Sequence, residues 1–579
     1  MSGFNAILTK IAAATQSITE QPPAPSKRGT DVPAMKEWFT PKPHQEAAVK
    51  RLFENNGKMI MVHSTGTGKT ASSIYGFEKL RHAGKATKTI VITPAGLRTN
   101  YADAVSEFTT SRAHVADRPG DIDPKADYNV VGYETFRQDP IGIMQRAGAD
   151  TMIVDEYHRI RNENASTSQA LFAGRQLAKN FIGLTASFIN NKPAEIAPLL
   201  ALSENNPTLT RDEFNRRFVR TAGSLTSFTG KERPRLGIKN EREFVKAVYP
   251  KIDFVATEDV PGNSMPKKQV TNVRVPMSEE QYKLYQLALN KLGPISEYIT
   301  EQDPNVKVRD TDRIFTQIGQ ARQLANSLHM GRKDVTPEQA AVRTPKVRQV
   351  IEDTKKHLSE KPDNNVVLYT NLVNGGVDVL SAGLRAADID HALFIGKGTE
   401  VDGQSVTERI RQAGVKDFKE GRKRVILISG AGAEGLDLKN ATAFYALDGH
   451  FNPERVLQAE ARARRLGGQA HRPVEQRVVD VRRYQSVAPV SEQPSFFSRM
   501  LGRRAPRTTD QWMYDVAGEK YKTNQQFYNA LKAPNKYIRK EIAPNGKVRY
   551  VYPEEVKQPG LFAKLTGAPE SRYKYEVPT

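Results

Sequence analysis

Residues 61–70 read MVHSTGTGKT, and this stretch decides the fold class. It joins the apolar run Lys58–Val62 to a helix-period stretch that begins near Thr70. A strand that passes through a glycine-rich loop into a helix is suited to phosphates, because backbone N–H groups at the helix start point toward the anion. The strict pattern G-x-x-x-x-G-K-[ST] has a glycine where this chain has His63, at the loop's entry. We interpret His63 as a departure that leaves the site intact.

The loop supplies the residues expected to hold ATP and Mg²⁺. Gly66 and Gly68 let the backbone approach the phosphates closely. Lys69 is expected to reach the β- and γ-phosphate oxygens, and Thr70 to bind Mg²⁺. The predicted nucleotide-binding residues are Ser64, Thr65, Gly66, Thr67, Gly68, Lys69 and Thr70. Because Gly-Lys-Thr is not a rare string, the prediction needs a second motif.

The second motif is the stretch TMIVDE at residues 151–156, an apolar run that ends in two carboxylates. At the carboxyl end of a strand, Asp155 is expected to hold Mg²⁺, and Glu156 to orient and deprotonate the attacking water. The alternative is a solvated Asp-Glu pair on a loop. The apolar run directly before the pair disfavours that alternative.

Strand-like and helix-like segments alternate along most of the chain, which predicts an α/β fold with parallel sheets. The predicted architecture is two similar α/β lobes that face a cleft, with a helical insert and a small basic C-terminal region. The predicted domains are an amphipathic helix and linker (1–35), a first ATP-binding lobe (36–205), a helical, strand-poor insert (206–340), a second lobe (341–487) and a basic accessory region (488–579). In the last region, Asn545-Gly546 predicts a β-hairpin turn.

Composition narrows the class of protein. The 579 residues carry 86 Lys and Arg against 65 Asp and Glu, a formal net charge of +21, which favours a nucleic-acid partner. The alternative is a basic protein kept soluble by its charge. There is no cysteine, which excludes disulfides and cysteine-bound zinc. No apolar run reaches the roughly 18 residues that span a bilayer. We expect a cytoplasmic protein.

The motifs together resemble helicase superfamily two, and within it the Swi/Snf-type DNA translocases. The stretches PHQ (43–45), HSTGTGKT (63–70), DEYHRIRN (155–162) and LTASFINN (184–191) follow in that family's order. DEFNRRF (212–218) and MPKKQVTNVRVPMSEEQYKLYQ (265–286) resemble the Swi/Snf helical region, which generic helicases lack. The resemblance covers about residues 36–485 and implies two RecA-like P-loop lobes and a DNA-dependent ATPase. It also implies that Gln45 contacts the adenine and that His158 helps to link the two lobes.

The stretch at 429–468, from SGAGAEGLDLKN to QAEARARRLGG, resembles the last two motifs of the family. A helix over 454–465 would place Arg462 and Arg465 on one face, where one of them can stabilise charge on the transferring phosphoryl group. The resemblance makes Arg465 that arginine and Arg462 its neighbour; the alternative is a basic helix facing solvent. AEGLDLKN departs from the usual pattern and is closer to ATPases of phages and large DNA viruses, which suggests a phage origin, with action in the host cytoplasm or association with a virion.

The resemblance also implies where a nucleic acid binds, through backbone contacts that carry no sequence information. The positions are Thr93-Pro94, Tyr133–Thr135, Thr370-Asn371 and Gly432–Gly435. Movement along duplex DNA, or remodelling of protein–DNA complexes, is the favoured function. A helicase that separates DNA or RNA strands is the second possibility, and a non-enzymatic DNA-binding virion or structural component the third. The basic, tyrosine-rich C-terminal hairpin either grips DNA, packs as a structural element, or docks on a partner protein.

Overall fold

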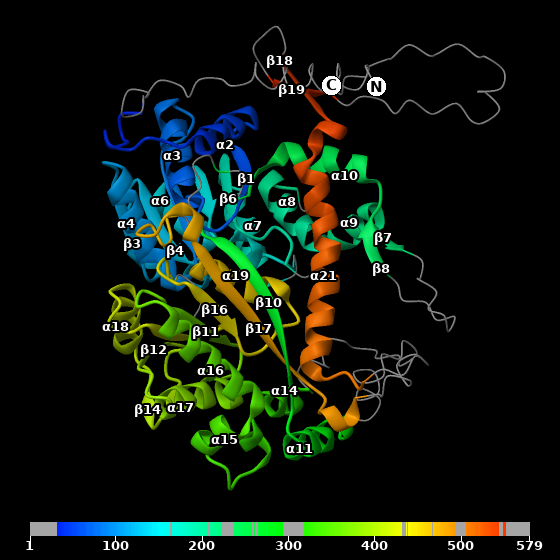
Figure 1. Ribbon diagram of the computed structural model, residues 1–579. Coiled ribbons are helices and arrows are strands. Elements are labelled where there is room, and N and C mark those ends of the chain that lie inside the picture. Colours follow the sequence, from blue (N-terminus) through cyan, green and yellow to red (C-terminus); the bar gives the residue numbers. More distant parts are fainter. Residues whose placement is uncertain are drawn as a thin grey trace, which may run out of the picture.

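The computed structural model describes residues 32–162, 165–190, 192–206, 208–222, 235–256, 260, 265–292, 318–430, 436, 438–465, 467–493, 505–542 and 548–551. These residues form two parallel sheets with helices on both faces, as the alternation of segments predicts (Figure 1). The predicted N-terminal helix, the Asn545-Gly546 turn and the Gly432–Gly435 segment lie outside the described residues. Among the helices that are described, none combines the length and apolar character needed to cross a membrane.

The first lobe is built on a seven-stranded sheet in which every neighbouring pair is parallel. Its strands, in sheet order, are β3 (Ala113–Ala116), β4 (Tyr128–Gly132), β2 (Thr89–Thr93), β5 (Thr151–Val154), β6 (Asn180–Thr185), β1 (Lys58–His63) and β9 (Ile252–Val255). The central strands are buried on both faces and therefore read as continuous apolar runs. Because parallel strands end at one edge, β1 and β5 bring the glycine loop and the Asp-Glu pair to the same side.

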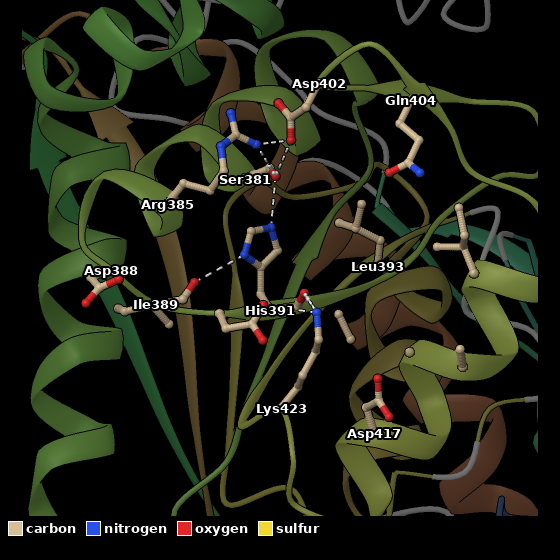
Figure 2. A pocket seen from close by; sticks show the side chains of 15 residues that line it. Ser381, Arg385, Asp388, Ile389, His391, Leu393, Asp402, Gln404, Asp417 and Lys423 are labelled. Atoms are coloured by element: carbon tan, nitrogen blue, oxygen red, sulfur yellow. Dashed lines mark hydrogen bonds and ion pairs between the residues drawn. The ribbon is translucent and has the colours of Figure 1, made fainter.

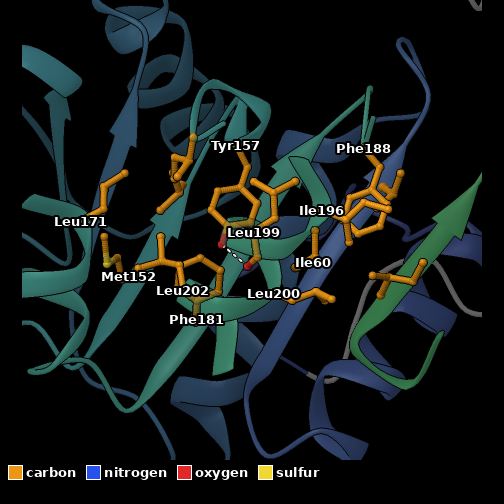
Figure 3. Packing of buried hydrophobic residues seen from close by; sticks show 14 of the residues in the cluster. Ile60, Met152, Tyr157, Leu171, Phe181, Phe188, Ile196, Leu199, Leu200 and Leu202 are labelled. Atoms are coloured by element: carbon orange, nitrogen blue, oxygen red, sulfur yellow. Dashed lines mark hydrogen bonds between the residues drawn. The ribbon is translucent and has the colours of Figure 1, made fainter. Parts of the chain in front are cut away.

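Helices cover both faces of this sheet and complete two apolar cores. One face is covered by α2 (Pro43–Glu54), α3 (Lys69–His82) and α4 (Arg98–Phe108). The other is covered by α5 (Tyr133–Gln138), α6 (Pro140–Ala147), α7 (Ser166–Arg175) and α8 (Ile196–Glu204). Figure 3 shows Tyr157 inside the core between the first sheet and helices α5 to α8, where its hydroxyl donates a hydrogen bond to the Leu199 carbonyl oxygen at 2.5 Å. This buried anchor fixes the chain directly after the Asp-Glu pair.

The second lobe repeats the plan with a six-stranded parallel sheet. Its strands, in sheet order, are β10 (Lys267–Pro276), β17 (Val478–Val487), β16 (Ala443–Ala446), β11 (Val366–Thr370), β15 (Val425–Ser429) and β12 (His391–Phe394). One face packs against α15 (Pro337–Arg343), α16 (Pro345–Glu360) and α17 (Asp378–Ala386), and the other against α18 (Glu408–Lys419) and α19 (Pro453–Ala463). A short pair, β13 (Glu400–Val401) and β14 (Gln404–Ser405), lies at the edge of this lobe.

The region expected to be a strand-poor insert is not strand-poor, and that prediction is wrong. It holds helices α9 (Arg211–Phe218), α10 (Glu241–Val248), α11 (Glu279–Asn290) and α14 (Gly319–Asn326), and also a short hairpin of β7 (Val219–Ala222) and β8 (Arg235–Ile238). Strands β9 and β10 from this region join the edges of the first and second sheets. The residues of β10 are mostly exposed, so this strand lacks the apolar run that marks a buried one.

A long C-terminal helix, α21 (Thr509–Lys532), crosses from the second lobe to the first (Figure 1). Its 24 residues span about 36 Å at 1.5 Å per residue. The start of the helix buries Trp512 and Met513 with α11 and α14, whereas Phe527 and Tyr528 near its end enter the core of the first lobe. The accessory region is therefore dominated by an inter-lobe helix that sequence patterns did not predict.

The predicted C-terminal hairpin is present as β18 (Arg539–Ile542) paired antiparallel with β19 (Val548–Val551). Tyr537, just before it, donates a hydrogen bond to Glu241 at 2.9 Å, and Tyr550 packs against Tyr249 with ring centroids 6.4 Å apart. Both tyrosines thus contact the first lobe, which favours a structural role for the hairpin over a grip on DNA. Tyr552 lies outside the described residues.

Candidate active site

The glycine loop has the backbone geometry that a phosphate loop requires. Gly66 and Gly68 have φ angles of 87° and 86°, in the left-handed region that favours glycine. A Cβ on Gly68 would also lie 2.9 Å from Gln45 Nε2, so the end of the Gln45 side chain would have to move to admit it. Helix α3 begins at Lys69, immediately after the loop. The first N–H groups of a helix have no acceptor within it, so those of α3 are available to bind phosphate oxygens at the loop.

His63 does not disturb this loop, because its side chain points away from it. The imidazole is fully buried, and its Nε2 lies 2.6 Å from Asp253 Oδ2 on the neighbouring strand β9. Its carbonyl oxygen accepts a hydrogen bond from Lys69 Nζ at 3.2 Å. The residue that breaks the strict pattern therefore joins β1 to β9, and its backbone still positions Lys69.

The two carboxylates after β5 are held in a fixed arrangement. Asp155 Oδ1 accepts a hydrogen bond from Glu156 N at 2.9 Å, and Asp155 Oδ2 accepts one from Thr93 Oγ1 at 3.3 Å. Glu156 has a φ of 48°, which is uncommon for a residue with a side chain and is characteristic of functional positions. Its Oε2 lies 3.2 Å from His158 Nδ1. The turn thus places two carboxylates side by side with different partners.

These different surroundings shift the pKa values of the Asp155 and Glu156 carboxyl groups in opposite directions. Burial, together with the adjacent charge of Glu156, raises the pKa of Asp155 to about 6. Burial also opposes ionisation of Glu156, but His158, Lys69 and Arg462 outweigh it and lower the pKa of Glu156 to about 2. Burial lowers the pKa of Lys69, while both carboxylates oppose that shift. Glu156 is therefore a carboxylate at neutral pH and can orient a water molecule.

The second lobe contributes its arginines to the same place. A cavity of about 470 Å³, which we call the cleft cavity, is lined by Lys69, Asp155 and Glu156 of the first lobe and by Arg462 and Arg465 of the second. Helix α19 ends at Ala463, two residues earlier than predicted, so Arg465 does not share a helix face with Arg462. Arg464 turns the chain into an extended conformation, and Arg465 Nη2 donates to the Leu436 carbonyl oxygen at 2.7 Å. Both arginines nevertheless reach the cavity.

Direct contacts hold the two lobes together beside the cleft cavity. Ser187 Oγ donates to Glu454 Oε2 at 2.8 Å, and Gln458 Nε2 donates to Ser187 Oγ at 3.3 Å. His158 lines a second inter-lobe cavity together with residues of α19. Two residues after Ser187, the N–H of Ile189 donates a hydrogen bond to the Tyr528 hydroxyl of α21 at 3.0 Å. The motifs of the two lobes therefore face each other.

Not every residue of the predicted nucleotide set lines the cleft cavity. Thr65, Gly66, Gly68, Lys69 and Thr70 line it, as do the catalytic candidates. Ser64 lines a neighbouring cavity, and Thr67 is buried with its hydroxyl donating to the Ser64 carbonyl oxygen at 2.8 Å. Gln45 is buried behind the loop, where its Nε2 lies 3.4 Å from the Gly68 carbonyl oxygen. Its predicted contact with adenine stays a prediction.

Leu97 and three polar residues also line the cleft cavity, and the sequence did not single them out. Asn100 and Tyr101 enter from α4, and Lys439 enters from the second lobe. Tyr101 is held by a 2.7 Å hydrogen bond to Ser73 of α3. Lys439 adds positive charge opposite the carboxylates. Its place in the AEGLDLKN stretch was the available signal, but spacing alone does not show that its side chain reaches the other lobe.

The hydroxyls expected to touch a nucleic acid lie inside the protein instead. Thr93 bonds to Asp155, Tyr133 donates to the Asp155 carbonyl oxygen at 2.6 Å, and Thr135 donates to the Asp117 carbonyl oxygen at 3.0 Å. Thr370 donates to Asp448, whose carboxylate also accepts from Asn371 Nδ2 at 2.8 Å. The four hydroxyl residues are buried, so in this arrangement their hydroxyls bond within the protein; contact with a nucleic acid near these positions stays a prediction.

Another cavity, of about 500 Å³, lies in the second lobe and shares none of the residues that line the cleft cavity (Figure 2). Figure 2 shows Ser381 between His391 Nε2, at 2.8 Å, and Asp402 Oδ2, at 3.1 Å. Arg385 pairs with Asp402, and Lys423 lies 3.0 Å from Asp390. Because its cations pair with aspartates within the site, this cavity has no marked preference for an anion.

The donors in the cleft cavity fit a hard divalent cation. Mg²⁺ prefers oxygen ligands, often one or two carboxylates together with substrate phosphates. The Asp155 carboxylate and the Thr70 hydroxyl line the same cavity as Lys69 and the glycine loop. These two side chains are the ones that would hold Mg²⁺ beside a triphosphate.

Comparison with known families identifies this arrangement. The SNF2-related domain model matches residues 44–331, and the helicase conserved C-terminal domain model matches residues 346–467. A protein of Acanthamoeba polyphaga mimivirus that carries the name of an ATP-dependent RNA helicase is 24% identical over 453 residues, covering 77% of this chain and 89% of the relative. An uncharacterised ATP-dependent helicase of Bacillus subtilis is 22% identical over 456 residues, covering 76% of each chain.

Among solved structures, the SWI2/SNF2 ATPase core of Sulfolobus solfataricus in complex with double-stranded DNA is similar, with a TM-score of 0.36 and 18% identity over 87% of this chain and 98% of that one. The two family models together include every strand of the two large sheets except β17, and both sides of the cleft cavity. The chain belongs to the Swi/Snf-related ATP-dependent helicases of superfamily two.

Proposed function

We propose that this protein hydrolyses ATP to ADP and phosphate with stimulation by DNA, and uses the cycle to move along duplex DNA or remodel protein–DNA complexes. One observation carries the proposal: the cleft cavity brings Lys69, Asp155 and Glu156 together with Arg462 and Arg465 across the two lobes. A triphosphate bound there touches both lobes, so cleavage and release change what holds the lobes together. A protein that only bound DNA would not need this assembly, which argues against a purely structural role.

The side chains divide the chemical work. Lys69 is placed to bind the β- and γ-phosphates, and the ionised Glu156 to orient the attacking water. Arg465, with Arg462 beside it, is placed to stabilise the charge that develops on the transferring phosphoryl group. When bound at Thr70 and Asp155, Mg²⁺ supplies charge neutralisation of the phosphates. Each of these roles belongs to a residue that lines the cleft cavity.

Two features support duplex DNA as the nucleic acid along which the protein moves. The SNF2-related match continues through residues 212–218 and 265–286, the segments that resemble the Swi/Snf helical region. The net charge of +21 favours a polyanion, and backbone contacts make binding tolerant of sequence and sensitive to salt. The name carried by the mimivirus relative favours RNA strand separation as the second candidate.

Displacement of a third strand from a DNA triplex separates these candidates. A duplex translocase releases the third strand in an ATP-dependent reaction and leaves the underlying duplex paired. A strand-separating helicase unwinds a partial DNA or RNA duplex in the parallel assay. Unwinding without triplex displacement would overturn the duplex-translocase proposal.

A further inference from the structure

A second inter-lobe cavity lies beside the cleft cavity and has a strongly positive lining. We call it the arginine cavity. Its volume is about 280 Å³, and it is lined by four arginines (Arg159, Arg161, Arg455 and Arg462) and one glutamate, Glu454. Buried or partly buried charges of one sign attract small ions of the other sign. The lining therefore selects an anion, unlike the aspartate-rich cavity of Figure 2.

The arginine cavity adjoins the place where the γ-phosphate would be cleaved. Arg462 lines both cavities. Glu156 lines the cleft cavity and His158 lines the arginine cavity. These two side chains are in contact, with 3.2 Å between Glu156 Oε2 and His158 Nδ1, and form the rest of the wall between the cavities. Phosphate formed beside Glu156 is thus separated from the arginine cavity only by the Glu156–His158 pair and by Arg462.

Exposure rises along the arginines from the shared wall to the surface. Arg462 and Arg161 are half-buried, whereas Arg159 and Arg455 are exposed. Burial lowers the pKa of Arg161, and the charges of Arg455 and Arg159 lower it further, although Glu195 and Glu454 oppose the shift. An anion among these guanidinium groups relieves their mutual repulsion. A graded line of positive charge is suited to moving an anion from a buried site to solvent.

We propose that the arginine cavity is the exit path for inorganic phosphate after ATP hydrolysis, with Arg462 passing the ion from the cleft cavity to Arg161 and then to Arg159 and Arg455. This inference rests on the proposed function, since only hydrolysis makes the product. The path is built from both lobes, with Arg159 and Arg161 on one side and Arg455 and Arg462 on the other. Cleft opening therefore widens it, which couples phosphate release to lobe movement.

The test compares cleavage with release in the full-length protein, in a single turnover without nucleic acid. Quenched flow measures the phosphate formed, and a fluorescent phosphate-binding sensor measures the phosphate released. We expect Arg159→Glu and Arg455→Glu each to slow release about fivefold, the order of one unfavourable charge contact near solvent, with cleavage unchanged. Arg161→Lys keeps the charge and should release phosphate within about twofold of wild type.

Arg409→Glu is the matched control, because Arg409 is exposed on α18 and lines neither the arginine cavity nor the cleft cavity. It should leave release unchanged. If release follows cleavage as closely in the Arg159 and Arg455 variants as in wild type, the proposal is overturned. If these variants instead weaken duplex DNA binding and flatten its salt dependence without delaying release, the arginines bind nucleic-acid phosphates and the exit path is wrong.

A binding experiment keeps the inference separate from the proposed function. Inorganic phosphate is added to the full-length protein with ADP, and its phosphorus NMR line width is recorded. We expect wild type to broaden the line and the double variant Arg159→Glu/Arg455→Glu to broaden it several-fold less. A wild-type protein that fails to hydrolyse ATP refutes the proposed function. The absence of broadening with wild type refutes the phosphate site itself.

Discussion

Replacing His63 with glycine restores the strict phosphate-loop pattern, yet we expect it to damage the protein. The substitution removes the buried 2.6 Å contact between His63 Nε2 and Asp253 Oδ2. A hydrogen bond to a charged group is worth about 1.5–3 kcal/mol, and glycine within a strand costs about 0.5–1 kcal/mol more. Arg51 remains 3.6 Å from Asp253, which limits the loss. The expected decrease in the free energy of unfolding is about 2–4 kcal/mol.

Urea unfolding of wild type, His63→Gly, Asp253→Asn and the double variant measures this loss. The double variant should lose less than the sum of the two single variants, because both remove the same contact. ATP affinity of His63→Gly should stay within about twofold of wild type, since the imidazole does not line the cleft cavity. A His63→Gly protein of wild-type stability that binds ATP more tightly would refute this reading of the loop.

Four other substitutions follow from the same structure. Asp510→Ala leaves the buried Lys346 ammonium without the carboxylate 2.6 Å away, so the free energy of unfolding should fall by about 3–5 kcal/mol in urea titrations. Lys69→Ala should lose ATP binding, measured with a fluorescent nucleotide. Glu156→Gln should bind ATP normally but hydrolyse it at least about a hundredfold more slowly. Arg465→Ala should bind both ATP and DNA and hydrolyse ATP about a thousandfold more slowly.

Each of these expectations has a contradicting result, which for Lys69→Ala is an unchanged affinity for the fluorescent nucleotide. The loss in Asp510→Ala should be largely recovered by Lys346→Met/Asp510→Leu, because an apolar pair removes both buried charges; no recovery would mean that the ion pair is not the cause. Wild-type turnover by Glu156→Gln would remove Glu156 from its role with water. Full turnover by Arg465→Ala would remove Arg465 from its role with the transferring phosphoryl group.

The nucleotide loop and the sheets could be predicted because their signals are local. The runs at Lys58–Val62 and Val366–Thr370 are buried on both faces, and such strands must be continuously apolar. The Asp155-Glu156 pair was found for the same reason, since it directly follows a run of this kind. Sequence spacing did not show where Arg465 lies, because Arg464 ends the helix and turns the chain.

Helix α21 and strand β10 were missed because their contacts are distant in sequence. The buried residues of α21 face two different lobes, so no single apolar stripe runs along it. Strand β10 pairs with β17 at a sheet edge and is largely exposed. The arginine cavity could not be predicted for the same reason, because Arg161 and Arg455 are far apart in the sequence and line one cavity only in the folded protein.

The steady-state rate of ATP hydrolysis, measured at low salt alone and with duplex DNA, single-stranded DNA or RNA, tests the central claim most directly. We predict hydrolysis by wild type that duplex DNA stimulates more than the other two nucleic acids, and its loss in Lys69→Ala. Stimulation mainly by single-stranded DNA or RNA would contradict the proposal that the protein moves along duplex DNA. The absence of hydrolysis under every condition would contradict the assignment of the cleft cavity as an ATPase site.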